Sequence, residues 1–307
     1  MNKIRRPILV TGSHRSGTTW AGRNLALAPN TGYIHEPFNL DHTVNSIDKQ
    51  YKYWFFHVSN DSGFEYKKTM DKVIEFKYPF FANLPRIHTS RNVARFFIDH
   101  SRSLYHRLRG DTPIVKDPIA FFSAEWLSST YNMNVLVMIR HPAAFCSSLK
   151  IKNWTFDFRH FFEQEELMNG FLFEFKDEIR ECINEEKDII DQAILLWNCI
   201  HKTISSYKKE HADWVFVRHE DLSQDPIEGF KSIFDSFGLD FNDDVKEAIY
   251  KNSGSHNPTE QQSKNEFVRN SKENIHNWKK RLTEDEIKKI KEKTSSISNE
   301  FYHEDDW

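Results

Sequence analysis

The chain has 307 residues, of which 42 are lysine or arginine and 45 are aspartate or glutamate, so its formal net charge is -3. Charged residues make up 28% of the chain and hydrophobic residues 38%, a balance typical of a globular protein and not of a disordered or membrane-embedded one. No apolar run approaches the roughly 20 residues that a membrane-spanning helix requires. The near-neutral charge argues against a general nucleic-acid-binding protein.

The three cysteines are Cys146, Cys182 and Cys199, an odd number without the spacing of a zinc site. We therefore expect reduced thiols and no disulfide framework. The chain starts with basic residues, but the apolar run that follows is too short for the core of a signal peptide. These features predict a cytoplasmic protein.

The first elements in the chain alternate between strand and helix patterns. An apolar run at residues 8–10 predicts a buried strand, residues 18–27 predict a helix that ends before Pro29, and a short strand is expected at 33–34. Residues from about 39 to 112 show no such alternation and are rich in aromatic side chains. They predict a mostly helical insertion, of the kind that often caps the acceptor side of an active site.

Regular alternation returns after this insertion. Residues 114–116 predict a strand, 119–129 a helix, and 135–139 the clearest buried parallel strand of the chain. A helix is expected from near Pro142, and another at 186–208, where apolar residues recur at helical spacing.

The last elements are a strand at 214–217, a helix capped by Asp225, and a final helix that starts with a capping box formed by Thr283 and Glu286. Because strands and helices alternate, the fold class expected is α/β, with a central parallel β-sheet flanked by helices. We expect a single domain over residues 1–307 that includes the mostly helical insertion.

The most informative segment joins the first strand to the first helix and reads Gly12-Ser-His-Arg-Ser-Gly17-Thr18-Thr19. Glycines allow the backbone amides of such a loop to converge on an anion, and the helix N-terminus adds partial positive charge. A triphosphate-binding loop has a lysine that reaches the β- and γ-phosphates. Thr18 occupies that position here, and the only cation of the loop is Arg15. The segment therefore predicts a ligand with a single 5′-phosphate.

The residues Arg15-Ser-Gly-Thr-Thr-Trp20 resemble the 5′-phosphosulfate loop of sulfotransferases, enzymes that use 3′-phosphoadenosine 5′-phosphosulfate (PAPS). Three further segments match this family in the family's order. Arg140 and Ser148, at the end of the best strand and on the helix after it, resemble the 3′-phosphate motif, in which an arginine fork and a hydroxyl hold a dianion. His219, before Glu-Asp-Leu, stands where the family usually has a tyrosine that touches the adenine.

The last match lies before the final helix and resembles the C-terminal segment that closes over the 3′-phosphate. Together the matches span residues 8 to about 290. The resemblance implies a P-loop-type, sulfotransferase/nucleoside-kinase-like fold, PAPS as the sulfuryl donor and no metal. It also implies cofactor contacts from Arg15, Ser16, Gly17, Thr18, Thr19, Arg140, Ser148, His219, Arg269, Ser271 and Lys272.

The resemblance further implies three catalytic residues. Arg15 is expected at the 5′-phosphate and the bridging oxygen, and Lys116 stands at a strand end where the family often has a catalytic lysine. Glu36, in Tyr-Ile-His-Glu-Pro-Phe, resembles the glutamate of the His/Phe-Glu-Pro segment in carbohydrate-type sulfotransferases and is the expected base, provided that burial raises its pKa. Asp117 and His35 are alternative bases.

The Glu-Pro segment also bears on the acceptor. The small-phenol branch has a histidine where this chain has Pro118, so the resemblance favours a bacterial, carbohydrate-type enzyme whose acceptor hydroxyl lies on a sugar, a glycolipid or another natural product. The aromatic residues at 51–56 and Trp154 are expected either at the acceptor site or in the core. Two other functions are considered: a P-loop kinase-like phosphotransferase, which the missing loop lysine opposes, and a non-catalytic nucleotide-binding protein.

Overall fold

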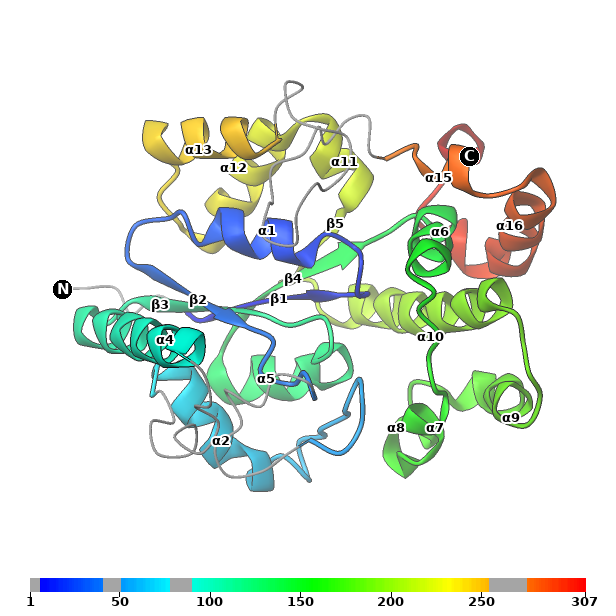
Figure 1. The fold of residues 1–307 in the computed structure, drawn as a ribbon, viewed down its shortest axis with the longest axis horizontal. Coiled ribbons are helices and arrows are strands. Elements are labelled where there is room, and N and C mark those ends of the chain that lie inside the picture. The colour runs from blue at the N-terminus through cyan, green and yellow to red at the C-terminus, as the bar shows by residue number, and fades with distance from the viewer. Residues whose placement is uncertain (1–5, 41–50, 78–89, 254–274) are drawn as a thin grey trace.

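The computed structural model describes residues 6–40, 51–77, 90–253 and 275–307. A five-stranded sheet with the order β2-β3-β1-β4-β5 runs through the centre of the molecule (Figure 1), and every neighbouring pair is parallel. The strands are β1 (Ile8–Gly12), β2 (Thr31–His35), β3 (Thr112–Lys116), β4 (Asn134–Ile139) and β5 (Val215–Arg218). Each expected strand is present, and the expected α/β class with a parallel sheet is confirmed.

Helices cover both faces of the sheet, as buried parallel strands require. One face carries α1 (Thr18–Leu25), α11 (His219–Gln224), α12 (Pro226–Phe237) and α13 (Asp243–Ser253), and the other carries α5 (Ala124–Tyr131) and α10 (Ile189–Glu210) (Figure 1). The strand side chains alternate accordingly. Ile8 and Val10 join the core under α1 and α12, whereas Leu9 joins the larger core under α5 and α10.

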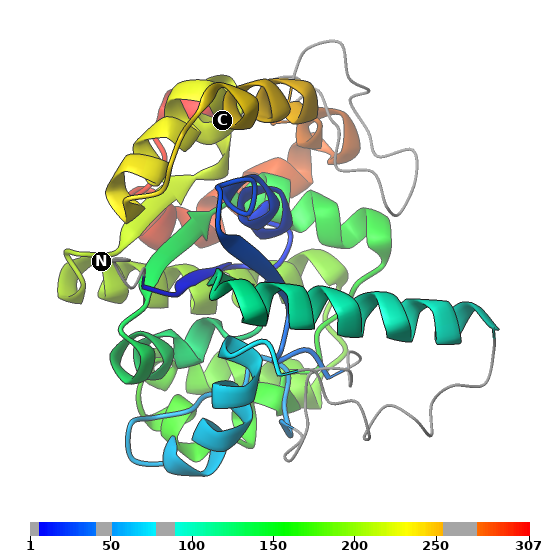
Figure 2. The ribbon, with the colours of Figure 1, turned by 90° about the vertical axis from the view of Figure 1, so that its left-hand side faces the viewer.

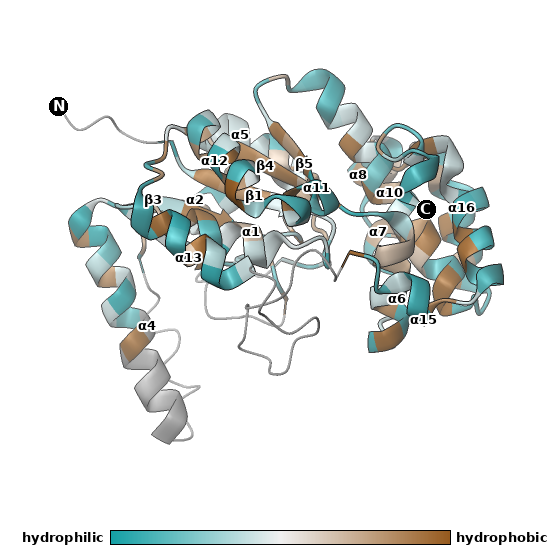
Figure 3. Cartoon of the chain, turned by 90° about the horizontal axis from the view of Figure 1, so that it is seen from above, coloured by the Kyte–Doolittle hydropathy of each residue, from teal (hydrophilic) through white to brown (hydrophobic). Residues whose placement is uncertain are grey.

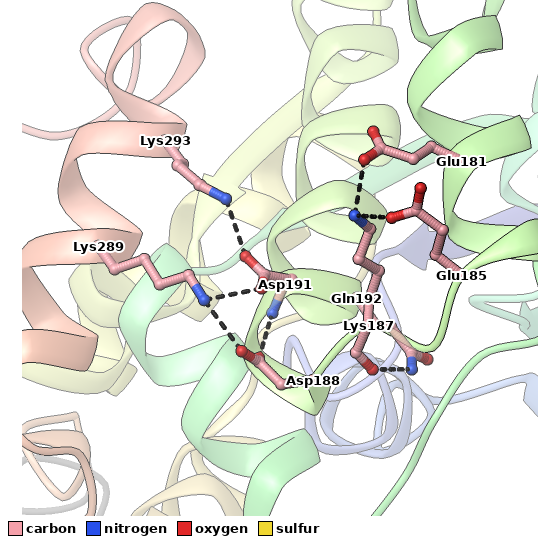
Figure 4. Close-up of polar contacts among 8 residues, drawn as sticks. All are labelled: Glu181, Glu185, Lys187, Asp188, Asp191, Gln192, Lys289 and Lys293. Atoms are coloured by element: carbon pink, nitrogen blue, oxygen red, sulfur yellow. Dashed lines mark hydrogen bonds and ion pairs between the residues drawn. The ribbon is translucent and has the colours of Figure 1, made fainter.

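A helical layer beside α10 completes one end of the molecule. It contains α6 (Pro142–Lys152), α15 (Trp278–Arg281) and α16 (Glu284–Ser298) (Figure 1). Lys289 and Lys293 of α16 donate to the Asp191 carboxylate of α10 at 2.7 and 2.9 Å, and Lys187 binds Glu181 at 2.6 Å (Figure 4). Ion pairs between partly exposed side chains thus hold α16 against α10, the helix that packs on the sheet.

Several short helices were not expected from the sequence. They are α7 (Arg159–Phe162), α8 (Glu165–Asn169) and α9 (Lys176–Asn184), together with the 3-10 turns η2 (Phe121–Ser123), η3 (Phe173–Phe175) and η4 (Glu304–Asp306). The helix expected at 119–129 begins five residues late, at Ala124, because the Asp117 carboxylate accepts the amides of Ile119 and Ala120 and a 3-10 turn follows.

The described part of the insertion between β2 and β3 contains α2 (Phe64–Ile74) and α4 (Ser90–Arg109), so its mostly helical character is as expected. The sequence left open whether the aromatic residues at 51–56 belong to the acceptor site or to the core. Tyr51, Phe55 and Phe56 are buried in the core. Trp154, by contrast, is 53% exposed. Helix α4 extends away from the body of the molecule (Figure 2).

Local signals at helix ends agree with the sequence. The Asp225 carboxylate caps α12 by accepting the Glu228 amide at 3.3 Å, and Thr283 and Glu286 form both hydrogen bonds of a capping box. Cys146, Cys182 and Cys199 are free thiols. Within the described ranges, no helix has the length and apolar character needed to cross a bilayer.

Candidate active site

Because all five strands are parallel, their carboxyl ends meet at one edge of the sheet, the usual ligand edge of such folds. The glycine loop follows β1 at this edge, and Glu36 follows β2. Lys116 ends β3, Arg140 follows β4, and His219 follows β5. Five expected site segments that lie far apart in the sequence therefore converge on one side of the sheet.

The loop after β1 leaves the start of α1 open. Gly17 has a φ of 89° and precedes α1, whose N-terminus no side chain caps and whose first turn holds no acidic residue. The first amides of the helix are thus available to an anion. The Ser16 hydroxyl donates to the Ser13 carbonyl at 2.5 Å and holds the loop in shape, while Thr18 is buried and Thr19 half-buried.

His219 lies directly against this loop. A Cβ atom at Gly17 would come within 2.5 Å of the His219 ring, so only glycine permits this approach. The His219 ring also lies 5.7 Å from the ring of Trp20, and its Nδ1 is hydrogen-bonded to Ser223 at 2.9 Å. The residue that stands in place of the family's tyrosine is therefore a neighbour of the glycine loop.

A side-chain hydrogen bond joins the loop to α6. Arg15 Nε donates to the Ser148 hydroxyl at 2.9 Å, across 133 residues of sequence. The sequence assigned Arg15 to the 5′-phosphate and Ser148 to the 3′-phosphate. Because these two side chains are in direct contact, the residues expected at the 5′-phosphate and at the 3′-phosphate both lie at the Arg15 guanidinium group.

Arg140 has a different partner. Its guanidinium Nε lies 3.5 Å from Oε1 of Glu220, and this oxygen also accepts the His141 amide at 3.2 Å. The other oxygen, Oε2, accepts the Tyr302 hydroxyl at 2.9 Å. Glu220 therefore braces the ends of β4 and β5. No hydrogen bond joins Arg140 to Ser148 in this structure, so the expected pair is not assembled by direct contact.

Lys116 and Glu36 form an ion pair at the ends of β3 and β2. The Lys116 side chain has no exposed surface, and its Nζ contacts Glu36 Oε1. The other carboxylate oxygen of Glu36 accepts from Asn39 at 2.5 Å, and the Glu36 amide donates to the Lys116 carbonyl at 2.8 Å. Glu36 also has a φ of 43°, an unfavourable left-handed conformation for glutamate of the kind that concentrates at functional sites.

The pKa of Glu36 differs from the expectation. Burial alone would raise it, but the charge of Lys116 and of His35 and the hydrogen bonds from Lys116 and Asn39 outweigh burial, so the pKa lies below its ordinary value. The condition of a raised pKa is therefore not met, because the buried ammonium group faces this carboxylate, which the sequence could not show. Burial in turn lowers the pKa of Lys116, and the Glu36 charge opposes that effect.

The alternative bases have different surroundings. Asp117 is fully buried and accepts the amides of Phe38 at 2.7 Å, Ile119 at 2.9 Å and Ala120 at 3.3 Å. Burial, followed by the nearby charge of Glu36, raises its pKa to about 7. His35 Nε2 lies 3.9 Å from the Glu36 carboxylate. Asp117 thus organises the turn after β3, and His35 flanks the ion pair.

The sequence reasoning missed His14, which lies in the loop itself. Its ring is surrounded by the rings of Phe145, Phe55 and Trp154, at centroid distances of 5.1, 5.6 and 6.0 Å. Burial and the charge of Arg15 lower its pKa to about 3, so the imidazole is neutral. The only signal in the sequence was a histidine directly before the loop arginine.

Three expected contacts, Arg269, Ser271 and Lys272, lie outside the described residues. The chain that follows them returns to the end of β4. There the Trp278 ring stacks on His141 at a centroid distance of 5.2 Å and an interplanar angle of 12°.

The residues present fit an anionic ligand at the start of α1. The loop offers an uncapped helix N-terminus, Arg15 and a buried Ser13 hydroxyl that has no partner in the described part of the chain. An anion is the ligand that such donors prefer. Together the parallel sheet, the glycine loop after β1 and the polar groups at the carboxyl edge define an α/β protein of the P-loop type.

The comparisons with known proteins name the family. The model of the sulfotransferase family matches residues 7–243, more than half of the chain, so this chain belongs to the sulfotransferase family. No curated protein matches the sequence significantly.

The solved structures that match this chain are distant in sequence. The sulfotransferase domain of the olefin synthase from Synechococcus PCC 7002 is 15% identical, with 95% of this chain and 96% of that chain covered and a TM-score of 0.44. Sulfotransferase STF9 from Mycobacterium avium is 12% identical, with 98% and 78% covered and a TM-score of 0.47. Mouse sulfotransferase SULT7A1 complexed with PAP is also 12% identical, with 96% and 85% covered and a TM-score of 0.46.

Proposed function

We propose that this protein transfers the sulfuryl group of PAPS to a hydroxyl group of a sugar, a glycolipid or another natural product. The observation that carries the proposal is the buried Lys116–Glu36 ion pair, on the same edge of the sheet as the lysine-free glycine loop. Sulfuryl transfer needs a cation that stabilises charge on the transferred group and a carboxylate that accepts the proton of the acceptor hydroxyl.

In this proposal the donor is held at two points. The start of α1 and Arg15 bind the 5′-phosphate, with Thr18 and Thr19 at the first turn of the helix. Ser148 and Arg140 bind the 3′-phosphate. The Arg15–Ser148 hydrogen bond supports the arrangement, because it makes the loop and α6 adjacent before any donor is bound. His219, against Gly17, is the proposed neighbour of the adenosine.

When bound, PAPS supplies a sulfuryl group whose bond to the 5′-phosphate oxygen breaks, with its electron pair, as the acceptor oxygen bonds to sulfur. Glu36 accepts the proton of the acceptor hydroxyl, and Lys116 and Arg15 stabilise charge on the sulfuryl and bridging oxygens. Glu36 is ionised at neutral pH, since its pKa is lowered by Lys116 despite burial. When Lys116 turns toward the sulfuryl oxygens, Glu36 loses its counter-ion and becomes a stronger base.

Glu36 is preferred to the other candidate bases for a geometric reason. Both oxygens of the fully buried Asp117 already accept backbone amides, so neither is open to an acceptor hydroxyl. The Glu36 side chain remains 15% exposed and carries the charge that faces Lys116. His35 lies beside the Glu36 carboxylate, whereas Lys116 is paired with Glu36 itself.

A thermal-shift titration tests the donor. We expect 3′,5′-adenosine bisphosphate (PAP) without magnesium to raise the melting temperature by mass action, and AMP, which lacks the 3′-phosphate, to raise it little. A response to ATP with magnesium but not to PAP would contradict the proposal and favour a kinase. Sulfation of a panel of sugars and glycolipids with labelled PAPS then tests transfer itself, and binding without any transfer would indicate a non-catalytic protein.

Arg140 provides the matched variant. Arg140→Lys keeps a cation opposite Glu220 but loses the planar fork, so PAP affinity should fall by about tenfold or more. Arg159→Lys, on the exposed surface, should leave PAP affinity unchanged. Equal affinities of both variants would remove Arg140 from the donor site.

A further inference from the structure

The last turn of helix α4 holds the contacts that the structure describes between this helix and the body of the molecule. Figures 2 and 3 show that the helix projects from the body. His106 Nδ1 is paired with the Asp111 carboxylate at 2.8 Å, and its ring lies 5.2 Å from that of Phe76. Arg109 donates to Asn30 at 2.8 Å.

The described part of α4 presents apolar side chains to solvent. Ile98, Leu104, Tyr105 and Leu108 are 55%, 43%, 55% and 78% exposed, and they make up four of the eleven large hydrophobic side chains that are exposed in the described residues. At helical spacing these four positions fall within an arc of about 120°, and His106, which faces the body, lies on the opposite side. The described part of the helix therefore has a mostly apolar face, interrupted by Ser101, that is directed away from the protein.

The same helix is strongly basic. Its 20 residues include five arginines and one aspartate, although the whole chain has a net charge of -3. Arg102 and Arg107 are exposed, and neither has an ion-pair partner in the part of the chain that the structure describes. The apolar face is thus accompanied by cations that the protein itself does not neutralise.

We propose that α4 docks on the surface of an anionic lipid membrane, with its apolar face among the acyl chains and its arginines at the phosphate groups. A projecting helix that combines an apolar face with unneutralised arginines has the chemistry of an interfacial helix. α4 would lie on the bilayer, since no described helix is suited to cross it. A second copy of the chain fits this face less well, because two such helices would bring ten arginines together. This docking does not depend on the proposed sulfuryl transfer.

Cosedimentation of the full chain with vesicles tests the proposal. We expect binding to vesicles of phosphatidylcholine mixed with phosphatidylglycerol, and little binding to phosphatidylcholine alone. Leu108→Glu should reduce binding about tenfold, because an apolar anchor becomes an anion. Arg102→Gln and Arg107→Gln should each reduce it about fivefold at low salt. All of these side chains are exposed, so melting temperatures should not change.

Two matched controls are offered by the chain. Phe173→Glu alters an apolar side chain that is 65% exposed elsewhere, and Lys231→Gln removes an exposed charge from α12; both should bind as the unchanged protein does. Absence of binding to the anionic vesicles, or equal binding of Leu108→Glu, would overturn the proposal. A dimer in sedimentation equilibrium that Leu108→Glu dissociates, without vesicle binding, would assign the face to self-association instead.

Discussion

Lys116 has no exposed side-chain surface, and a buried ammonium group is costly unless an anion faces it. Glu36 is that anion, so one carboxylate serves both the fold and the proposed chemistry. The cost appears in the backbone, where Glu36 takes a left-handed conformation in order to follow β2 and still face the end of β3. At the scale of single residues, the candidate site is therefore held by a charge pair and not by packing alone.

Glu36→Gln separates the two roles. Turnover should fall by about a hundredfold or more because no base remains, while PAP affinity stays nearly unchanged. Stability should also fall, because Lys116 loses its counter-ion and must remain buried unpaired or lose its proton. Steady-state kinetics and PAP titration measure the first two quantities, and urea unfolding the third. Retained turnover would transfer the role of base to Asp117 or His35.

At the scale of elements, helix ends fix the parts of the site. The start of α16 is an example: the Glu286 carboxylate accepts the Thr283 amide at 2.8 Å and also binds Lys150 of α6 at 2.7 and 2.8 Å. Lys150 follows Ser148 by two residues on α6. The cap of the C-terminal helix thus also stabilises the helix that holds a proposed phosphate contact.

Removal of the capping hydroxyl tests this connection. Thr283→Ala should lower the free energy of unfolding by about 1 kcal/mol, because the Glu286 amide loses its acceptor. Thr283→Ser keeps the hydroxyl and should retain most of the stability. Chemical denaturation measures the difference, and equal loss in both variants would show that the cap contributes nothing.

At the scale of the whole molecule, buried histidines tie stability to pH. Burial and the charge of Arg140 lower the pKa of His141 to about 3. Burial also lowers the pKa of His201 to about 3. The unfolded chain therefore binds more protons than the folded one below pH 6.5, so stability is lost as the pH falls from that value. Asp117 acts in the opposite direction, because its raised pKa adds stability as the pH falls below about 7.

His14, whose pKa is also lowered to about 3, acts in the same direction as His141 and His201, so three histidines against one aspartate leave a net loss. The free energy of unfolding should decrease by about 2.7 kcal/mol per pH unit between pH 6 and 4, as measured by urea unfolding. His201→Gln cannot titrate and should make this dependence shallower, and His141→Gln provides a second variant if the first is poorly folded. A stability that rises toward pH 4 would show that carboxylates, and not these histidines, dominate.

Local features of the sequence were sufficient for the strands, the glycine loop and the helix caps, because each depends on neighbours a few residues away. Apolar runs predict buried parallel strands, and glycines predict where the backbone must turn or leave room, as Gly17 does for His219. The short helices α7 to α9 were missed because they lack enough turns to show a periodicity. The order of motifs along the chain also indicated the sulfotransferase family, which the family comparison confirms.

Which side chains meet depends on the tertiary arrangement of the strands and loops. Strand order brings Lys116 to Glu36 across 80 residues and the loop geometry brings Arg15 to Ser148 across 133, and neither pairing has a local signal. The direction of the Glu36 pKa shift could not be predicted for the same reason, since it depends on a charge that the strand order supplies. The exposed face of α4 depends likewise on the absence of packing there. The elements and the chemical groups that they carry follow from local sequence, whereas contacts, burial and charge pairing follow from how distant segments are brought together.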